Sequence, residues 1–137
     1  MKASIDYFKL QAKNFFRDFK TQKQEPNGIF SYTPRFFNDI DDIIVSCDVD
    51  EKHFTLMQAQ HLISYLSGFN KWADLLHASE TELEIGRIIL EYRNNPITGG
   101  SLFEDWKMYL SNIEQTTGAL GSEQKLDLLQ IYLEIEK

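Results

Sequence analysis

Few side chains in this sequence can carry out covalent or metal chemistry. There is one cysteine, Cys47, and there are three histidines, His53, His61 and His77. A thiol beside an imidazole can act as a nucleophile with its general base, so an enzyme would use Cys47 or a histidine as its reactive group. The histidines lack the spacings of zinc sites, and a lone cysteine beside isoleucines is usually a small buried hydrophobic residue. We therefore predict no catalytic residue, no metal ligand and no cofactor.

Carboxylates are concentrated between residues 39 and 51. A calcium-binding loop starting at Asp48 would need glycine at its sixth position and glutamate at its twelfth. Those positions are His53 and Ala59, so the motif fails. We interpret the stretch as an acidic docking patch or as a solvated surface. Its members are Asp39, Asp41, Asp42, Asp48, Asp50 and Glu51.

Basic side chains form a stripe along the first predicted helix. Lys9, Lys13, Arg17 and Lys20 follow at intervals of four, four and three, which places them on one face. The solvated face of an amphipathic helix has this pattern, and so does a surface that contacts RNA phosphates or an acidic partner. Membrane-surface helices share the pattern too, but the overall negative charge of the chain argues against that interpretation.

Residues 55–76 must position some of these candidate side chains. Their sequence predicts a helix, a glycine stop and a second short helix. Thr55 and Gln58 make a capping box, and apolar residues then recur at helical spacing. Gly68 can take the left-handed conformation that ends a helix. Asn70 is expected to cap the second helix. We interpret Gly68, Phe69 and Trp72 as a structural corner buried against other helices.

This stretch resembles a known segment. Ala59-Gln60, Ile63, Gly68-Phe69, Trp72 and Leu75 are similar to the "AQ…I…GF..W..L" segment of many small bacterial helical proteins of unassigned function. Some of those proteins are free-standing, and others carry the segment ahead of repeat domains. Residues 8–17 resemble the helix that often precedes it. The resemblance implies a helical corner and brings no catalytic or ligand-binding residues.

Capping and turn residues divide the rest of the chain. We expect a basic N-terminal helix at 4–22, a loop at 23–33 and a helical core at 34–137, which Pro34 opens as a first helical residue. Residues 79–82 and 101–104 are two further capping boxes. Gly86, inside the helix that follows the first of these boxes, allows a neighbouring helix to approach closely.

The last predicted helix follows Ser122 as its cap and is apolar on nearly all sides. Such a helix must be covered on more than one side, so it either runs through its own domain or forms the seam of a homodimer. Its apolar residues are Leu126, Leu128, Leu129, Ile131, Tyr132, Leu133 and Ile135.

Composition excludes several classes of protein. Hydrophobic residues at 42% and aromatic residues at 13% exclude a disordered chain. No apolar run approaches the roughly 18 residues of a membrane span, and the N-terminus lacks the apolar region of a signal peptide. A single cysteine cannot form an internal disulfide, which fits a reducing cytoplasm. The sequence predicts one all-α domain, 1–137, a compact bundle of six or seven short helices.

Charge is distributed unevenly along the chain. Residues 1–35 hold seven basic and three acidic side chains, which is a net charge of +4. The remaining residues carry a net charge of −11, which gives the total of −7. This asymmetry indicates either opposed binding surfaces or a basic helix lying on an acidic body, and the overall acidity argues against non-specific DNA binding by the whole domain.

These observations favour a small cytoplasmic, non-enzymatic adaptor or regulator that binds another protein or a nucleoprotein. RNA is a further candidate partner, no membrane is expected, and the chain is a monomer or a homodimer through its C-terminal helix. One alternative is a phage- or plasmid-borne, anti-CRISPR-like inhibitor of a nucleoprotein defence machine. It would use the acidic face as a nucleic-acid mimic or the basic helix on RNA. The other alternative is an unrecognised enzyme with Cys47 or a histidine as the reactive group.

Overall fold

The apolar spacing of the chain produces helices over most of its length in the computed structural model, which describes residues 3–93 and 102–136. Seven helices and one two-stranded antiparallel sheet are present in those residues, which confirms the predicted all-α class. The elements are α1 (Ala3–Phe19), β1 (Lys23–Gln24), β2 (Phe30–Ser31), α2 (Ile40–Ser46), α3 (Leu56–Leu66), α4 (Trp72–Leu76), α5 (Glu80–Arg93), α6 (Leu102–Thr117) and α7 (Ser122–Glu136).

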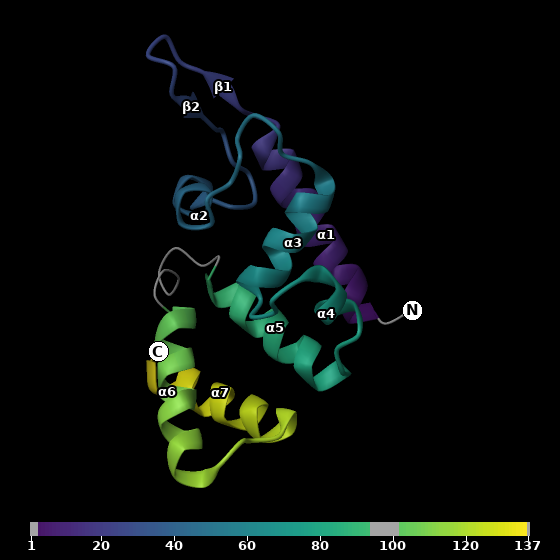
Figure 1. Cartoon of the computed structure of the whole chain (residues 1–137), viewed down its shortest axis with the longest axis vertical. Coiled ribbons are helices and arrows are strands. Elements are labelled where there is room, and N and C mark those ends of the chain that lie inside the picture. The colour runs from purple at the N-terminus through teal and green to yellow at the C-terminus, as the bar shows by residue number, and fades with distance from the viewer. Residues whose placement is uncertain (1–2, 94–101, 137) are drawn as a thin grey trace.

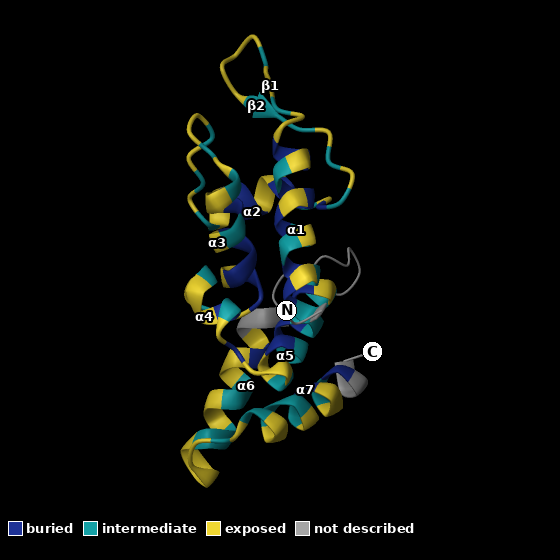
Figure 2. Ribbon diagram, turned by 90° about the vertical axis from the view of Figure 1, so that its right-hand side faces the viewer, coloured by how far each residue is buried: buried dark blue, intermediate teal, exposed yellow. Residues whose placement is uncertain are grey.

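The main hydrophobic core lies between α1 and α3, which run beside each other, with α5 packed on both (Figure 1). In Figure 2 the buried residues line the facing sides of these helices. Burying each large apolar side chain contributes roughly 1.5–3 kcal/mol, so this packing dominates the stability of the helices. From α1 the core receives Ile5, Phe8, Ala12, Phe15 and Phe19, and from α3 it receives Ala59, Leu62, Ile63 and Leu66.

Two predicted capping boxes are confirmed. At the start of α3 the Thr55 hydroxyl accepts the N–H of Gln58 at 3.2 Å, and the Gln58 side chain accepts the N–H of Thr55 at 2.8 Å. Ser79 and Glu82 make the same two bonds before α5, both at 3.1 Å. Each box satisfies two N–H groups that would otherwise lack partners at a helix start.

The predicted glycine stop after α3 is also confirmed. Gly68 has φ +94°, its N–H donates to the Tyr65 carbonyl at 3.0 Å, and the N–H of Phe69 donates to the Ser64 carbonyl at 2.9 Å. These two bonds define a Schellman motif, which turns the chain sharply toward α4.

The prediction of Asn70 as the cap of α4 is wrong. Lys71 occupies the cap position without a side-chain bond, and Nδ1 of His61 in α3 accepts the N–H of Trp72 at 3.3 Å. A side chain from the preceding helix therefore satisfies a donor that the local sequence leaves open.

The segment between α1 and α2 differs from the prediction in the end of α1, in a hairpin within the predicted loop and in the role of Pro34. α1 ends at Phe19 rather than at residue 22, and the predicted loop contains a hairpin in which Lys23 pairs with Ser31 and Gln24 with Phe30. Gly28, at φ +87°, closes this hairpin, which projects from one end of the molecule in Figure 1.

Pro34 does not open a helix. α2 begins only at Ile40, because the intervening backbone N–H groups bind a side chain of α1 instead of forming a helical turn. The stretch from Ile43 to Ser46 is nevertheless helical, as expected for part of the predicted helical core.

A second, smaller apolar cluster joins α6 and α7 to the end of α5, at the opposite end of the molecule from the hairpin (Figure 1). Its buried members are Ile89, Trp106, Leu129 and Leu133. The outward side of α7 includes Ile131, which is 53% exposed, so the chain itself does not cover this helix all round. α7 starts at Ser122 itself, and Gly121 holds the cap position predicted for that serine.

One further prediction lies partly outside the described residues. The capping box at 101–104 includes Ser101, which precedes residue 102, where the description of α6 starts. Among the described helices, none combines the length and the apolar character needed to cross a bilayer.

Candidate functional site

An open groove of about 550 Å³ lies between the end of α2 and the outer face of α3. It collects residues from the last turn of α2, from the loop that follows it, from α3 and from the corner after α3. The lining residues are Ser46, Cys47, Asp48, Val49, Asp50, Phe54, Gln58, His61, Leu62, Tyr65 and Asn70. We call this hollow the α2–α3 groove.

Asp48 sets the direction of the chain at the rim of this groove. It is the single non-glycine residue with positive φ, at 52°, in residues 3–93 and 102–136. Its N–H donates to the Val45 carbonyl at 3.3 Å, and the N–H of Val49 donates to the Ile44 carbonyl at 3.0 Å, so α2 ends in the same motif as α3. Sequence reasoning missed this helix end, because glycine is the usual residue there.

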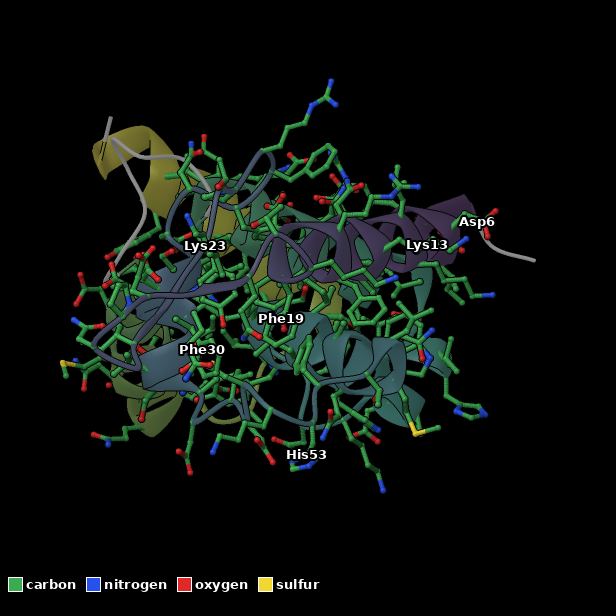
Figure 3. The ribbon with its side chains drawn as sticks, turned by 90° about the horizontal axis from the view of Figure 1, so that it is seen from above. Asp6, Lys13, Phe19, Lys23, Phe30 and His53 are labelled. Carbon is green, nitrogen blue, oxygen red and sulfur yellow. The ribbon has the colours of Figure 1, made fainter. Side chains whose placement is uncertain are left out.

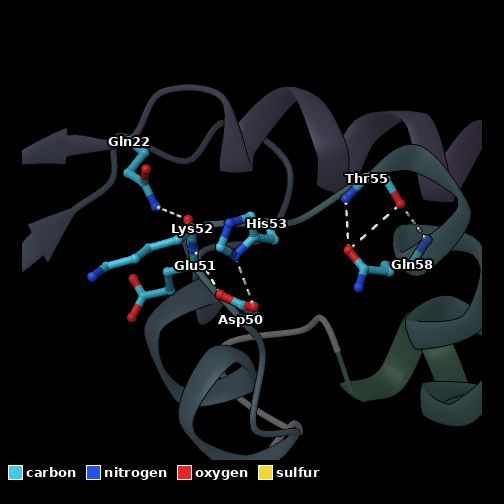
Figure 4. Close-up of polar contacts among 7 residues, drawn as sticks. All are labelled: Gln22, Asp50, Glu51, Lys52, His53, Thr55 and Gln58. Carbon is cyan, nitrogen blue, oxygen red and sulfur yellow. Dashed lines mark hydrogen bonds and ion pairs between the residues drawn. The ribbon is translucent and has the colours of Figure 1, made fainter.

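Asp50 and its neighbours form a tight polar turn beside the groove (Figure 4). One carboxylate oxygen of Asp50 accepts the N–H of Lys52 at 3.0 Å, and the other lies 3.2 Å from Nδ1 of His53. The Lys52 N–H bond, followed by the contact with His53, lowers the pKa of Asp50. Asp50 therefore stays ionised at neutral pH.

Glu51 makes different contacts from Asp50, so the residues of the predicted acidic patch do not act as one surface. The Tyr32 hydroxyl donates to the Glu51 carboxylate at 2.5 Å, and the Gln22 amide donates both to the Tyr32 hydroxyl at 2.8 Å and to the Glu51 carbonyl at 3.1 Å. Burial, then the bond to Glu51, raises the pKa of Tyr32. We call these three residues the Gln22 clasp, which fastens the loop before α3 to the chain after α1.

The remaining carboxylates of the stretch lie at the start of α2. Asp41 and Asp42 are exposed, and Asp39 is half-buried at the cap position without a side-chain capping bond. Burial raises the pKa of Asp39. Within residues 3–93 and 102–136, no three histidine, cysteine or acidic side chains meet in a way that could hold a metal ion.

The structure brings Cys47 and His61 to the same groove. Burial raises the pKa of the Cys47 thiol, which favours the protonated form over the nucleophilic thiolate. His61 accepts the Trp72 N–H through Nδ1, so its ring is committed to capping α4. His53 lies in the Asp50 turn, and Nδ1 of His77 donates to the Ala73 carbonyl at 2.8 Å.

The basic stripe follows α1, on another part of the surface. Lys13, Arg17 and Lys20 are exposed, whereas Lys9 is half-buried. Arg17 donates to the Asn14 side chain at 3.3 Å, and the Lys20 ammonium lies 4.5 Å from the centre of the Phe16 ring. Figure 3 shows His53 at the edge of the molecule, away from Lys13 and α1.

The corner residues Gly68, Phe69 and Trp72 do not line the groove. Phe69 and Trp72 are half-buried and pack on the main core. A Cβ on Gly86 of α5 would lie 2.9 Å from the Phe69 ring and 3.3 Å from the Ser67 carbonyl oxygen. α5 therefore approaches the corner as closely as the glycine in its sequence predicts.

Asp18 of α1 is the residue that sequence reasoning missed most clearly. Its side chain is buried, and its carboxylate accepts the backbone N–H groups of Arg35, Phe36 and Phe37 at 2.8, 2.9 and 2.7 Å. These bonds hold the chain that leads into α2, and α2 forms one wall of the groove. The spacing between Asp18 and residues 35–37 carries no local signal for this contact.

The chain matches no protein-family model, no curated protein and no solved structure. The resemblance of residues 59–75 to the bacterial helix-glycine-helix segment stays a prediction. Function therefore has to follow from the geometry and chemistry of this chain.

Proposed function

We propose that the protein is a non-enzymatic adaptor or regulator that binds another macromolecule through the α2–α3 groove. The observation that carries this proposal is the groove itself, an open hollow of about 550 Å³ with apolar side chains at its base and the half-exposed Tyr65 at its side. Tyrosine is enriched at protein interfaces, because its ring provides apolar contact area and its hydroxyl makes a hydrogen bond.

The open shape supports a macromolecular partner. Small-molecule sites enclose most of their ligand, whereas this groove is largely open to solvent. Burial raises the pKa of the Cys47 thiol, and Nδ1 of His61 accepts the Trp72 N–H, which argues against catalysis by a thiolate and an imidazole in this groove. The proposed partner is a protein or a nucleoprotein in a reducing cytoplasm, where the unpaired Cys47 would persist as a thiol.

Photo-crosslinking in the source organism tests this function. A photoreactive phenylalanine analogue replaces Tyr65 in the groove, and in a matched control it replaces Gln130, which is exposed on α7. We expect a specific adduct from position 65 and none of that mass from position 130. Equal adducts from both positions, or none from position 65, would exclude the groove as the binding surface.

A second candidate function is the inhibition of a nucleoprotein defence machine. It is favoured by the row of exposed cations, Lys13, Arg17 and Lys20, along α1. If they contact RNA, reversing the three charges should abolish binding, and wild-type affinity should fall steeply with salt. Reversing the charges of the exposed Lys52 and Lys71 is the control. RNA binding that survives the α1 change would rule out this role for the helix.

The same candidate has an acidic version. Asp41 and Asp42 are exposed at the start of α2 and could imitate nucleic-acid phosphates. Neutralising both should then abolish capture of a nucleic-acid-binding partner while the helical circular dichroism stays unchanged. A homodimer through α7 stays a proposal as well, supported by the exposed Ile131, and light scattering over a concentration series tests it.

A further inference from the structure

The ionised residues of the α2–α3 groove have one sign. Asp48 and Asp50 contribute carboxylates to its lining, and none of the lining residues is a lysine or arginine. Both aspartates are exposed, and the Asp50 side chain keeps 58% of its surface accessible. Hydrogen bonds to the backbone fix Asp50 in place, so its charge stands at a defined position.

Apolar and aromatic side chains line the groove as well. Val49 and Phe54 are half-buried, Leu62 of α3 is buried, and Tyr65 of α3 is 50% exposed. The groove thus combines a base that favours apolar contact with a rim that favours positive charge. A nucleic acid would bring its phosphates against the two carboxylates, which disfavours that class of occupant.

We propose that the α2–α3 groove binds a peptide segment of a partner protein, with an apolar side chain against Phe54 and Leu62 and a lysine or arginine beside Asp48 and Asp50. This inference rests on the proposed function, since it names the chemistry of the partner at the same site. An amphipathic segment in an apolar groove is a common mode of peptide recognition, and flanking charges set its specificity and rate of association. A guanidinium beside Tyr65 would gain a cation–π contact as well.

Selection from a random library tests the proposal without a known partner. A displayed library of twelve-residue random peptides is selected against the immobilised full chain, and the enriched peptides are then measured on the Tyr65→Ala variant. We expect enriched peptides to combine apolar residues with lysine or arginine. Their dissociation constants should rise about tenfold or more for Tyr65→Ala, because a half-exposed aromatic at the side of a groove is a typical binding hot spot.

Charge is then tested with variants that keep the local backbone. Asparagine tolerates the positive φ of Asp48 and can still accept the Lys52 N–H at position 50, so Asp48→Asn/Asp50→Asn removes two charges without disturbing the turn. We expect this double variant to weaken the selected peptides about five- to tenfold at low salt, with a smaller effect at high salt. The matched control is Glu123→Gln/Asp127→Asn, which removes two exposed charges from α7.

The outcomes separate the two levels of the proposal. Enriched peptides that depend on Tyr65 but are neutral or acidic would overturn the inference. So would peptides that the α7 control weakens as much as Asp48→Asn/Asp50→Asn does. In both cases the groove remains a binding surface. Peptides indifferent to Tyr65→Ala, or no enrichment at all, would contradict both the inference and the proposed function.

Discussion

Asp18 shows how one side chain can determine the path of a distant segment. Its carboxylate accepts three backbone N–H groups, one of them, from Phe37, at a buried position. Alanine at this position would leave those donors without a partner. We expect Asp18→Ala to lower the free energy of unfolding by about 3 kcal/mol or more, since bonds to charged groups are worth roughly 1.5–3 kcal/mol each and are not additive. Urea denaturation followed by circular dichroism measures the change.

A matched control for this prediction is Asp127→Ala on α7, where the side chain is exposed. We expect that variant to stay within about 0.5 kcal/mol of the wild type. Asp18→Asn should fall between the two, because the amide keeps one acceptor oxygen and replaces the other with a donor. Similar stabilities for Asp18→Ala and Asp127→Ala would show that the three bonds contribute little.

Asp48 is expected to reduce stability. A non-glycine residue in the left-handed region costs roughly 1 kcal/mol, less for aspartate than for most residues. Asp48→Gly should therefore raise the free energy of unfolding by about 0.5–1 kcal/mol, and Asp48→Asn should leave it nearly unchanged. Urea midpoints compare the three proteins. A less stable glycine variant would mean that the Asp48 side chain makes a favourable contact that outweighs its backbone strain.

Two tyrosines should make the protein sensitive to alkali. Burial raises the pKa of Tyr7, helped by Glu91, and burial with Glu51 raises that of Tyr32. Because the folded-state pKa values lie above the unfolded value of about 10, this contribution to stability is complete below pH 10 and is lost as pH rises further. The urea midpoint should fall between pH 10 and 11.5, and less steeply in Tyr7→Phe/Tyr32→Phe. Tyr65→Phe, which alters a half-exposed ring, should follow the wild type.

The residues that sequence analysis identified correctly act on neighbours in the chain. Thr55 with Gln58, and Gly68 with Tyr65, make bonds within three residues, so their types and spacing suffice for prediction. Asp18 reaches 17 to 19 residues along the chain, and that contact exists only after α1 has packed. The acidic patch was treated as one unit for the same reason, although Glu51 is in fact turned toward Tyr32.

At the scale of elements, the crossing of α5 over the end of α3 depends on one missing side chain. A Cβ on Gly86 would lie 2.9 Å from the Phe69 ring, 3.3 Å from the Phe8 ring and 3.3 Å from the Ser67 carbonyl oxygen. Phe69 is half-buried and has room to move, but Phe8 is fully buried and the carbonyl is part of the backbone. The neighbours of a new methyl group can therefore adjust only in part.

We expect Gly86→Ala to destabilise the protein by about 1–2 kcal/mol. Overpacking of this kind costs roughly 1–3 kcal/mol and outweighs the gain of up to about 1 kcal/mol from the better helix former. Thermal unfolding measures the result, and Gln115→Ala, at an exposed position of α6, is the control that should change little. A stabilised Gly86→Ala variant would show that α5 can move away from the corner.

Elements with strong local signals were predictable, and those fixed by long-range contacts were not. The apolar period of α1, α3 and α5 repeats over three or more turns, which is enough to predict a helix. The late start of α2 and the hairpin after α1 depend on bonds from Asp18 and on pairing across a glycine turn. Proline at position 34 fits a helix start locally, but its neighbours already have other partners.

At the scale of the whole molecule, two apolar clusters share α5. The main cluster has seventeen buried members within the described residues and the second has four, so α6 and α7 rest on far less buried surface than α1 and α3. Local opening is easiest where few apolar contacts must break. We expect the amides of α6 and α7 to exchange with deuterium faster than those of α1 and α3.

Leu129→Ala sharpens this test. It removes one of the four buried residues of the second cluster, so it should accelerate exchange in α6 and α7 by at least tenfold while α1 and α3 keep their protection. Ile63→Ala in the main cluster should instead accelerate exchange throughout the chain. Uniform acceleration in the Leu129→Ala variant would mean that the two clusters unfold as one cooperative unit.

Sequence analysis identified several lining residues of the groove without identifying the groove. Cys47, His61, Asp48 and Asp50 were each considered as chemical candidates. Their meeting at one surface depends on how α2 is held against α3, which no local pattern encodes. The sequence around Tyr65 carries no local signal of a surface position, because an aromatic at helical spacing is usually part of a core.

The fastening of α2 and its following loop has a consequence for specificity. Asp18 of α1 holds the chain that leads into α2, and the Gln22 clasp holds the loop that follows α2, while none of Asp18, Gln22 and Tyr32 lines the groove. The width of the groove therefore depends on residues that do not line it. Substitutions that lengthen or weaken these contacts should change which partner fits the groove, although every side chain that lines it stays the same. Divergent versions of this protein would then bind different partners because of residues that no partner contacts.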